Sequence, residues 1–180
     1  MKHFCIAFCL LLLLATSCNP VSSSIRNTNA LVLTLKITRK NETPFESILG
    51  QIVLKNQSDS NLLVNTRLLV LPQEVSPTFA EVLLLIHDSD GNVIDTRHSR
   101  IDFSFPSEEN FGLLKSGEQI EKTFNLTSWF SPSDFQKGKM YTLMVVYQND
   151  FDVTKTIDGV EVQSWVGTIQ SNDVSLVIVP

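Results

Sequence analysis

Short stretches of alternating or continuous apolar residues, separated by polar turns, fill the chain from residue 31 to its end. In Leu31–Thr38, leucine and isoleucine occupy every second position, a period typical of a β-strand with one buried face. Gly138–Tyr147 has the same period, with Tyr141 and Tyr147 on one predicted face. No stretch of about 12 residues follows a helical period, so the pattern predicts an all-β domain.

The pattern predicts about nine short strands. The apolar stretches from which they are expected to form number ten, at approximately 31–38, 50–56, 62–70, 81–87, 93–94, 101–105, 119–126, 138–147, 162–169 and 174–179. Glu81–His87 is almost wholly apolar, so we expect a central strand covered on both faces.

Polar segments between these stretches predict the turns. Asp-Gly within Asp88–Asn92 favours a hairpin, because glycine adopts positive φ without penalty. Leu113–Glu118 is predicted as a tight turn, and Ser131–Phe135 as one helical turn with a capping serine and an early proline. Asn149–Glu161 is predicted as a long acidic loop.

The stretch 114–147 resembles strands E and F of immunoglobulin-like domains, because an L-x-x-G-E turn and an alternating strand precede G-x-x-Y-x-h-x-h-x-Y. The ending W-V-G-T-I-Q-S-N-D-V is similar to the last strands of such domains in bacterial envelope proteins. The resemblance implies an immunoglobulin-like two-sheet antiparallel sandwich of about 7–9 strands. It also implies that Tyr141 bonds back to the preceding corner, with ordinary core packing as the alternative. The Cys…Trp…Cys pattern of antibody domains is absent.

The N-terminus begins with a short basic segment, followed by an apolar run from Phe4 to Ala15. This run is shorter than the roughly 20 residues that a transmembrane helix needs, so it predicts a secretory signal peptide over residues 1–17. Leu14-Ala-Thr-Ser-Cys18 then resembles a bacterial lipobox, although leucine is more usual than Ala15 at its position.

The lipobox resemblance implies cleavage before Cys18 and acylation of that cysteine, which anchors the chain to a membrane. The alternative is an ordinary secretory signal that leaves Cys18 as a free thiol. Asn19 stands where aspartate would signal retention in the inner membrane, so the outer membrane of a bacterial envelope is favoured. Residues 18–30 are predicted as a flexible tether and residues 31–180 as the domain.

Composition narrows the function classes. The 180 residues are 43% hydrophobic and 18% charged, which excludes a disordered chain. The net charge of −5 argues against a nucleic-acid partner. All three cysteines lie within the first 18 residues, so the domain can contain no disulfide.

Motifs for chemistry are scarce. His87 and His98 lack metal-ligand spacing, and we expect no metal, no cofactor and no enzymatic activity. Asp88, Asp90 and Asn92 have the spacing with which an EF-hand begins, but the glycine is misplaced and a β-turn explains them. The aspartates of 149–161 are interpreted as a solvated acidic loop; they are Asp150, Asp152 and Asp158. No nucleophile-elbow or phosphate-loop motif is present.

Binding surfaces therefore remain as the expected function, with a protein partner in the envelope. Five aromatic residues could serve as contacts, although plugging the ends of the core is favoured; they are Trp129, Phe130, Phe135, Phe151 and Trp165. The leading hypothesis is a non-enzymatic, membrane-anchored binding or structural module. One alternative is a protease inhibitor acting through Asn149–Glu161 or Val70–Phe79, and another is an accessory domain of a secreted hydrolase.

Overall fold

The computed structural model describes residues 29–38, 45, 48–72, 81–94 and 104–177. The predicted signal peptide, Cys18, Asn19 and most of the predicted tether lie outside these residues, as do His98 and most of the predicted strand 101–105. The described part is all-β, with twelve strands and three short 3-10 turns. The prediction of an all-β domain is confirmed.

The strands form four sheets. The first is antiparallel, in the order β1 (Leu31–Thr38), β2 (Leu49–Asn56) and β7 (Gln119–Asn125). In the second, β4 (Val70–Pro72) runs parallel to β5 (Val82–Asp88), which pairs antiparallel with β8 (Met140–Asn149).

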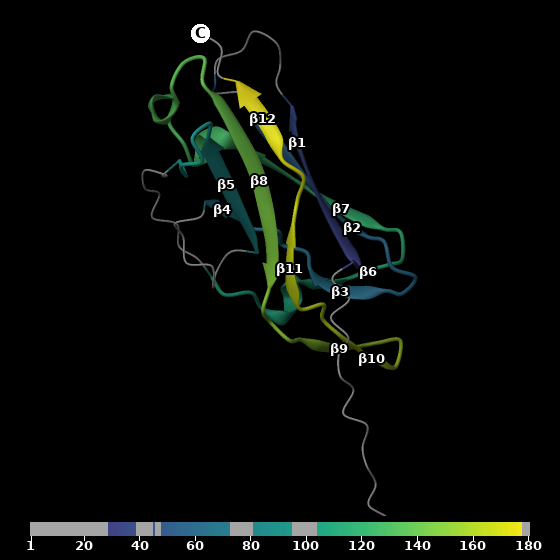
Figure 1. Ribbon diagram of the computed structural model, residues 1–180. Coiled ribbons are helices and arrows are strands. Elements are labelled where there is room, and N and C mark those ends of the chain that lie inside the picture. Colours follow the sequence, from purple (N-terminus) through teal and green to yellow (C-terminus); the bar gives the residue numbers. More distant parts are fainter. Residues whose placement is uncertain (1–28, 39–44, 46–47, 73–80, 95–103, 178–180) are drawn as a thin grey trace, which may run out of the picture.

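The far side of β8 is shared by two short strands (Figure 1). Here β11 (Gly167–Gln170) pairs with the end of β8, and β12 (Val174–Val177) pairs with its beginning. Two small antiparallel sheets complete the fold: β3 (Leu62–Asn65) with β6 (Phe111–Leu114), and β9 (Thr154–Ile157) with β10 (Val160–Gln163).

One hydrophobic core joins the two larger sheets. In β8 the predicted face is fully buried, since Tyr141, Leu143, Val145 and Tyr147 are at most 2% exposed. The alternating leucines of β1 and the apolar residues Ile52 and Leu54 of β2 belong to the same cluster. The period-two pattern thus identified the core correctly in both sheets.

Two expectations for β5 and its turn have different outcomes. Val82, Leu84 and Ile86 are buried, whereas the side chains on the other face are only half-buried, so the expectation of full cover on both faces is wrong. The turn after β5 is confirmed: Asp88 N–H donates to Asn92 O at 2.9 Å, and Gly91 has φ of 83°.

The predicted strand Leu62–Val70 is wrong, because the chain breaks between β3 and β4. Leu68 there has φ of 46° and is 1% exposed. The cause is the carboxylate of Glu81, which accepts hydrogen bonds from the Arg67 side chain and from Leu69 N–H at 2.8 Å. A buried acceptor distant in sequence therefore overrides the local strand pattern.

Two further predictions are wrong near the C-terminus. Asn149–Glu161 is not one long loop, since it contains β9 and the beginning of β10, joined by Asp158 and Gly159, both at positive φ. The predicted strand 162–169 is interrupted at Trp165, which packs inward instead of continuing the strand. The predicted tight turn 113–118 is present but is preceded by β6, which the sequence pattern did not reveal.

Candidate binding surface

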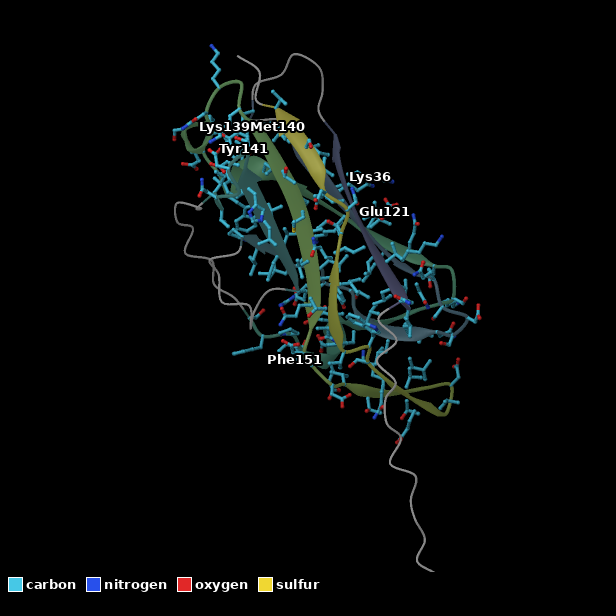
Figure 2. The ribbon with its side chains drawn as sticks, viewed as in Figure 1. Lys36, Glu121, Lys139, Met140, Tyr141 and Phe151 are labelled. Carbon is cyan, nitrogen blue, oxygen red and sulfur yellow. The ribbon has the colours of Figure 1, made fainter. Side chains whose placement is uncertain are left out.

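Tyr141 makes the bond that the sequence predicted. Its hydroxyl accepts a hydrogen bond from Gln136 N–H at 2.6 Å, and its ring meets Phe135 edge-on, with 5.0 Å between centroids. The corner begins with the predicted helical turn at Pro132–Asp134, which Ser131 caps by accepting from Ser133 N–H. Tyr141 therefore ties the start of β8 to the preceding corner (Figure 2).

The five aromatic candidates divide into two groups. Phe130, Phe135 and Trp165 are at most 9% exposed and fill the core, so the favoured interpretation is confirmed for them. Trp129 and Phe151 are half-buried. Among the described residues, the indole Nε1 of Trp129 is the one buried side-chain polar atom without a hydrogen-bond partner.

The acidic turn of Asp88, Asp90 and Asn92 holds a cation that belongs to the chain itself. Lys139 Nζ lies 3.0 Å from Asp88 Oδ2 and 3.0 Å from Asp90 Oδ2. Asp88 Oδ1 accepts from the backbone N–H groups of Asp90 and Asn92. The bond from Lys139, helped by these backbone donors and opposed by desolvation, holds the pKa of Asp88 well below 3.8. The ammonium group thus stands between the carboxylates where the EF-hand interpretation would put calcium.

A buried polar network crosses the break between β3 and β4, and sequence reasoning missed it. The Glu81 carboxylate, 2% exposed, accepts from Arg67 Nε at 2.7 Å and from Asn65 Nδ2 at 3.2 Å. The Tyr147 hydroxyl accepts from Asn65 N–H and donates to Asn65 O. Burial, with a smaller contribution from the Glu81 charge, raises the pKa of Tyr147 far above 10. Every side chain in this network is satisfied, which indicates a structural role.

Other chemical sites are scarce in the described ranges. These residues contain no group of three metal-ligating side chains, and His87 lies beside the Gly91 carbonyl, with Nδ1 3.4 Å from that oxygen. No helix within the described ranges has the length and apolar character needed to cross a membrane.

The most distinctive exposed element is the β9–β10 hairpin, which leaves the body of the fold after β8 and returns before β11 (Figure 1). Asn149, 1% exposed, fixes its base: Nδ2 donates to Trp165 O at 2.5 Å and to Phe151 O at 3.2 Å, while Oδ1 accepts from Phe151 N–H. The side chain of one buried asparagine therefore joins the two ends of the hairpin.

Ser164 adds a second tie on the same two chain segments. Its hydroxyl donates to Phe151 O at 2.8 Å and accepts from Val153 N–H at 2.9 Å, and its own N–H donates to Val153 O at 2.7 Å. Below it, the ring of Trp165 stacks on Tyr147 with 5.7 Å between centroids. The hairpin is thus anchored directly to the core.

The two faces of the hairpin differ. Lys155, Ile157 and Val162 are half-buried on the face toward the body, and Lys155 Nζ donates to Phe111 O of β6 at 2.7 Å. Every side chain on the opposite face is exposed; these are Thr154, Thr156, Glu161 and Gln163. Val160, next to the turn, is 62% exposed, the largest value among the exposed large hydrophobic residues of the described ranges.

The acidic residues predicted to be solvated are indeed exposed, since Asp150, Asp152 and Asp158 all lie at the surface. Asp158 lies in the turn of a folded hairpin, whereas Asp150 and Asp152 lie in the connection from β8 to that hairpin. The signal that would have revealed the hairpin is Asp158-Gly159, a dipeptide that favours a two-residue turn with positive φ at both positions.

Comparison of the chain with protein-family models and with curated proteins gives no match in either case.

Proposed function

We propose that this chain is a non-enzymatic lipoprotein of the bacterial envelope, anchored through Cys18 and acting as a binding module. The lipobox resemblance at Leu14–Cys18 supports the anchor, and Asn19 supports the outer membrane as its location. Two or more acyl chains are sufficient for stable anchoring. The net charge of −5 favours a protein partner over a nucleic acid.

We further propose that the domain is an immunoglobulin-like sandwich. Constant-type immunoglobulin domains place strands A, B and E in one sheet and strands C, F and G in the other. The sheet β1-β2-β7 and the sheet of β5, β8 and β11/β12 offer the same order, with strand G divided into two. The bond from Gln136 N–H to the Tyr141 hydroxyl supports the comparison with a tyrosine corner.

The tether limits how far the domain can lie from the membrane. Ten residues separate Cys18 from Asn29, so the two residues lie at most about 40 Å apart when the chain is fully extended. Asn29 O accepts from Gln57 Nε2 at 2.6 Å, and Ala30 O accepts from Gln57 N–H. The tether would therefore enter the domain beside the turn between β2 and β3.

The observation that carries the binding function is the anchored β9–β10 hairpin. Between strands F and G of the proposed fold, a minimal turn would suffice to connect β8 and β11. The chain instead builds an exposed hairpin whose base is fixed by Asn149, Ser164 and Trp165. Binding residues are commonly carried on such connections, because a rigid scaffold holds them in place and limits the entropy lost on binding.

Two experiments test the proposal. Cys18→Ala should abolish metabolic palmitate labelling and move the protein from the membrane fraction to the soluble fraction, whereas Cys9→Ala, in the predicted signal, should leave both unchanged. A membrane fraction unaffected by Cys18→Ala would contradict the lipid anchor.

Photo-crosslinkers placed one at a time over the surface of the anchored protein should give discrete adducts with an envelope protein. Stoichiometric inhibition of a protease, or a crosslink to a secreted hydrolase, would favour the respective alternative function.

A further inference from the structure

Several free edges of the described strands are blocked, each in a different way, as expected for β proteins that avoid unwanted pairing. At the β1 edge, Asn172 Oδ1 accepts from Leu35 N–H at 3.0 Å and its Nδ2 donates to Leu35 O at 3.1 Å. One side chain from the connection between β11 and β12 thus occupies the position that a pairing strand would need.

Charge, proline or a hydrogen bond blocks the edges of β7, β4, β3 and β6. The β7 edge carries Glu121 and Lys122 at its centre, on opposite faces of the strand. β4 is three residues long and ends in Pro72, which has no N–H to donate. At the β3 edge, Leu63 O accepts from Trp165 N–H at 2.8 Å. At the short strand β6, Phe111 O accepts from Lys155 Nζ.

The outer edge of β9 is also short, at four residues, but within the described ranges it contains no proline and no side chain bonds to its outward backbone groups. Ser164 N–H donates to Val153 O, which fixes the alternation of hydrogen bonds along the hairpin. Val153, Lys155 and Ile157 direct their backbone groups toward the partner strand, so Thr154 and Thr156 direct theirs outward. No strand within the described ranges pairs with this edge. The one charged residue of β9, Lys155, donates to Phe111 O and therefore does not block the edge.

The charge around this edge selects the kind of strand that could pair with it. Four exposed carboxylates lie close to β9 in the chain and are Asp150, which also accepts from Gln148 Nε2, Asp152, Asp158 and Glu161. The single lysine of the hairpin is engaged with the body. An approaching segment rich in lysine or arginine would be attracted, whereas an acidic one would be repelled.

We propose that β9 is a docking edge for an extended, positively charged segment of a partner protein, which adds to the hairpin as a third strand. The outward N–H and C=O groups of Thr154 and Thr156 supply the backbone hydrogen bonds, and the carboxylates close to β9 in the chain supply selectivity. This inference rests on the proposed binding function and gives it a site and a partner chemistry.

Peptide binding to the full-length protein, purified in a non-ionic detergent, tests the edge directly. The probes are two labelled heptapeptides, acetyl-KVKVTVK-amide and acetyl-EVEVTVE-amide, measured by fluorescence anisotropy. The basic peptide should bind at least tenfold more tightly than the acidic one, and its affinity should fall as salt is raised. Equal affinity for the two peptides, or no binding of the basic peptide, would overturn the proposal.

Two variants of one residue separate the backbone from the side chain. Thr156→Pro removes an outward N–H without removing a bond inside the hairpin, and should weaken binding of the basic peptide at least tenfold. Thr156→Val keeps the N–H and should bind within twofold of wild type. Unchanged binding by Thr156→Pro, with a wild-type circular dichroism spectrum and melting temperature, would contradict strand addition.

A charge-reversal pair tests selectivity. Asp152→Lys and Asp173→Lys make the same change at exposed positions, the first beside β9 and the second between β11 and β12. The first should weaken binding of the basic peptide severalfold more than the second. An equal effect of both variants would mean that binding depends only on the net charge of the protein and not on the position of the carboxylate. That result would contradict the proposed selectivity.

Crosslinking on the anchored protein distinguishes failure of this inference from failure of the binding function. A photo-crosslinker at position 154 should capture the same envelope protein at higher yield than one at position 173. Adducts that form only at positions outside the hairpin would overturn the docking edge while supporting a binding module. Absence of adducts at every position tested would contradict both.

Discussion

Strand β8 and the β9–β10 hairpin follow one another in the chain but are stabilised in different ways. β8 buries a complete face of large side chains, and its core-facing residues are essentially inaccessible. Neither β9 nor β10 contains a fully buried residue, and the hairpin depends on side-chain bonds to backbone groups at its base. Hydrophobic burial thus positions the scaffold, whereas a few buried polar groups position the exposed element.

The largest effect should come from truncating the buried face of β8. Leu143 is 0% exposed within the core cluster, so Leu143→Ala removes apolar contacts and leaves a cavity. We expect the free energy of unfolding to fall by about 3 kcal/mol. Met144→Ala, on the half-buried opposite face, is the matched control and should cost less than half as much in urea denaturation. Similar costs for the two variants would contradict the one-sided burial.

A smaller but more local effect should follow from Asn149→Ala. This change removes the donor to Trp165 O and Phe151 O and the acceptor of Phe151 N–H. We expect a loss of about 2 kcal/mol, because buried backbone groups are left without partners. Hydrogen exchange should accelerate most over Thr154–Gln163, while the amides of β5 and the first half of β8 keep their order of protection. Uniform acceleration across the domain would show that the hairpin is not an independent unit.

The difference between these regions also explains what the sequence could predict. Period-two alternation reports burial directly, so β1, β2, β7, β8 and β12 were predicted close to their observed bounds. The spacing of Gly138 and Tyr141 resembles that of a corner motif, so the bond from Tyr141 to the preceding corner could be predicted as well.

The missed features depend on contacts between residues distant in sequence. The break before Leu68 depends on Glu81, and the interruption at Trp165 depends on Tyr147 and Leu63. β9 and β10 are short and polar, so hydrophobic periodicity cannot detect them, although Asp158-Gly159 was a sufficient turn signal. The exposed edge of β9 could be identified only once the pairing of the other strands was known.

The smallest effect concerns the turn Asp88–Asn92. Whereas neutral side chains fix the base of the hairpin, this turn is held by an ion pair to Lys139. The folded protein has a lowered Asp88 pKa, so this carboxylate contributes stability above pH 3.8 and loses that contribution as the pH falls through the folded pKa. Lys139→Met should return the Asp88 pKa toward 3.8 and reduce stability at pH 7, and the difference from wild type should shrink as the medium is acidified below pH 3.8.

Lys137→Met, at an exposed neighbouring position, should show no such convergence in denaturation curves at pH 7 and pH 2. A constant difference between Lys139→Met and wild type at the two pH values would mean that Lys139 acts through its aliphatic chain and not through its charge. Convergence would instead show that the turn is anchored by charge, unlike the base of the hairpin, where the bonds of Asn149 and Ser164 involve neutral groups and should not titrate in this range.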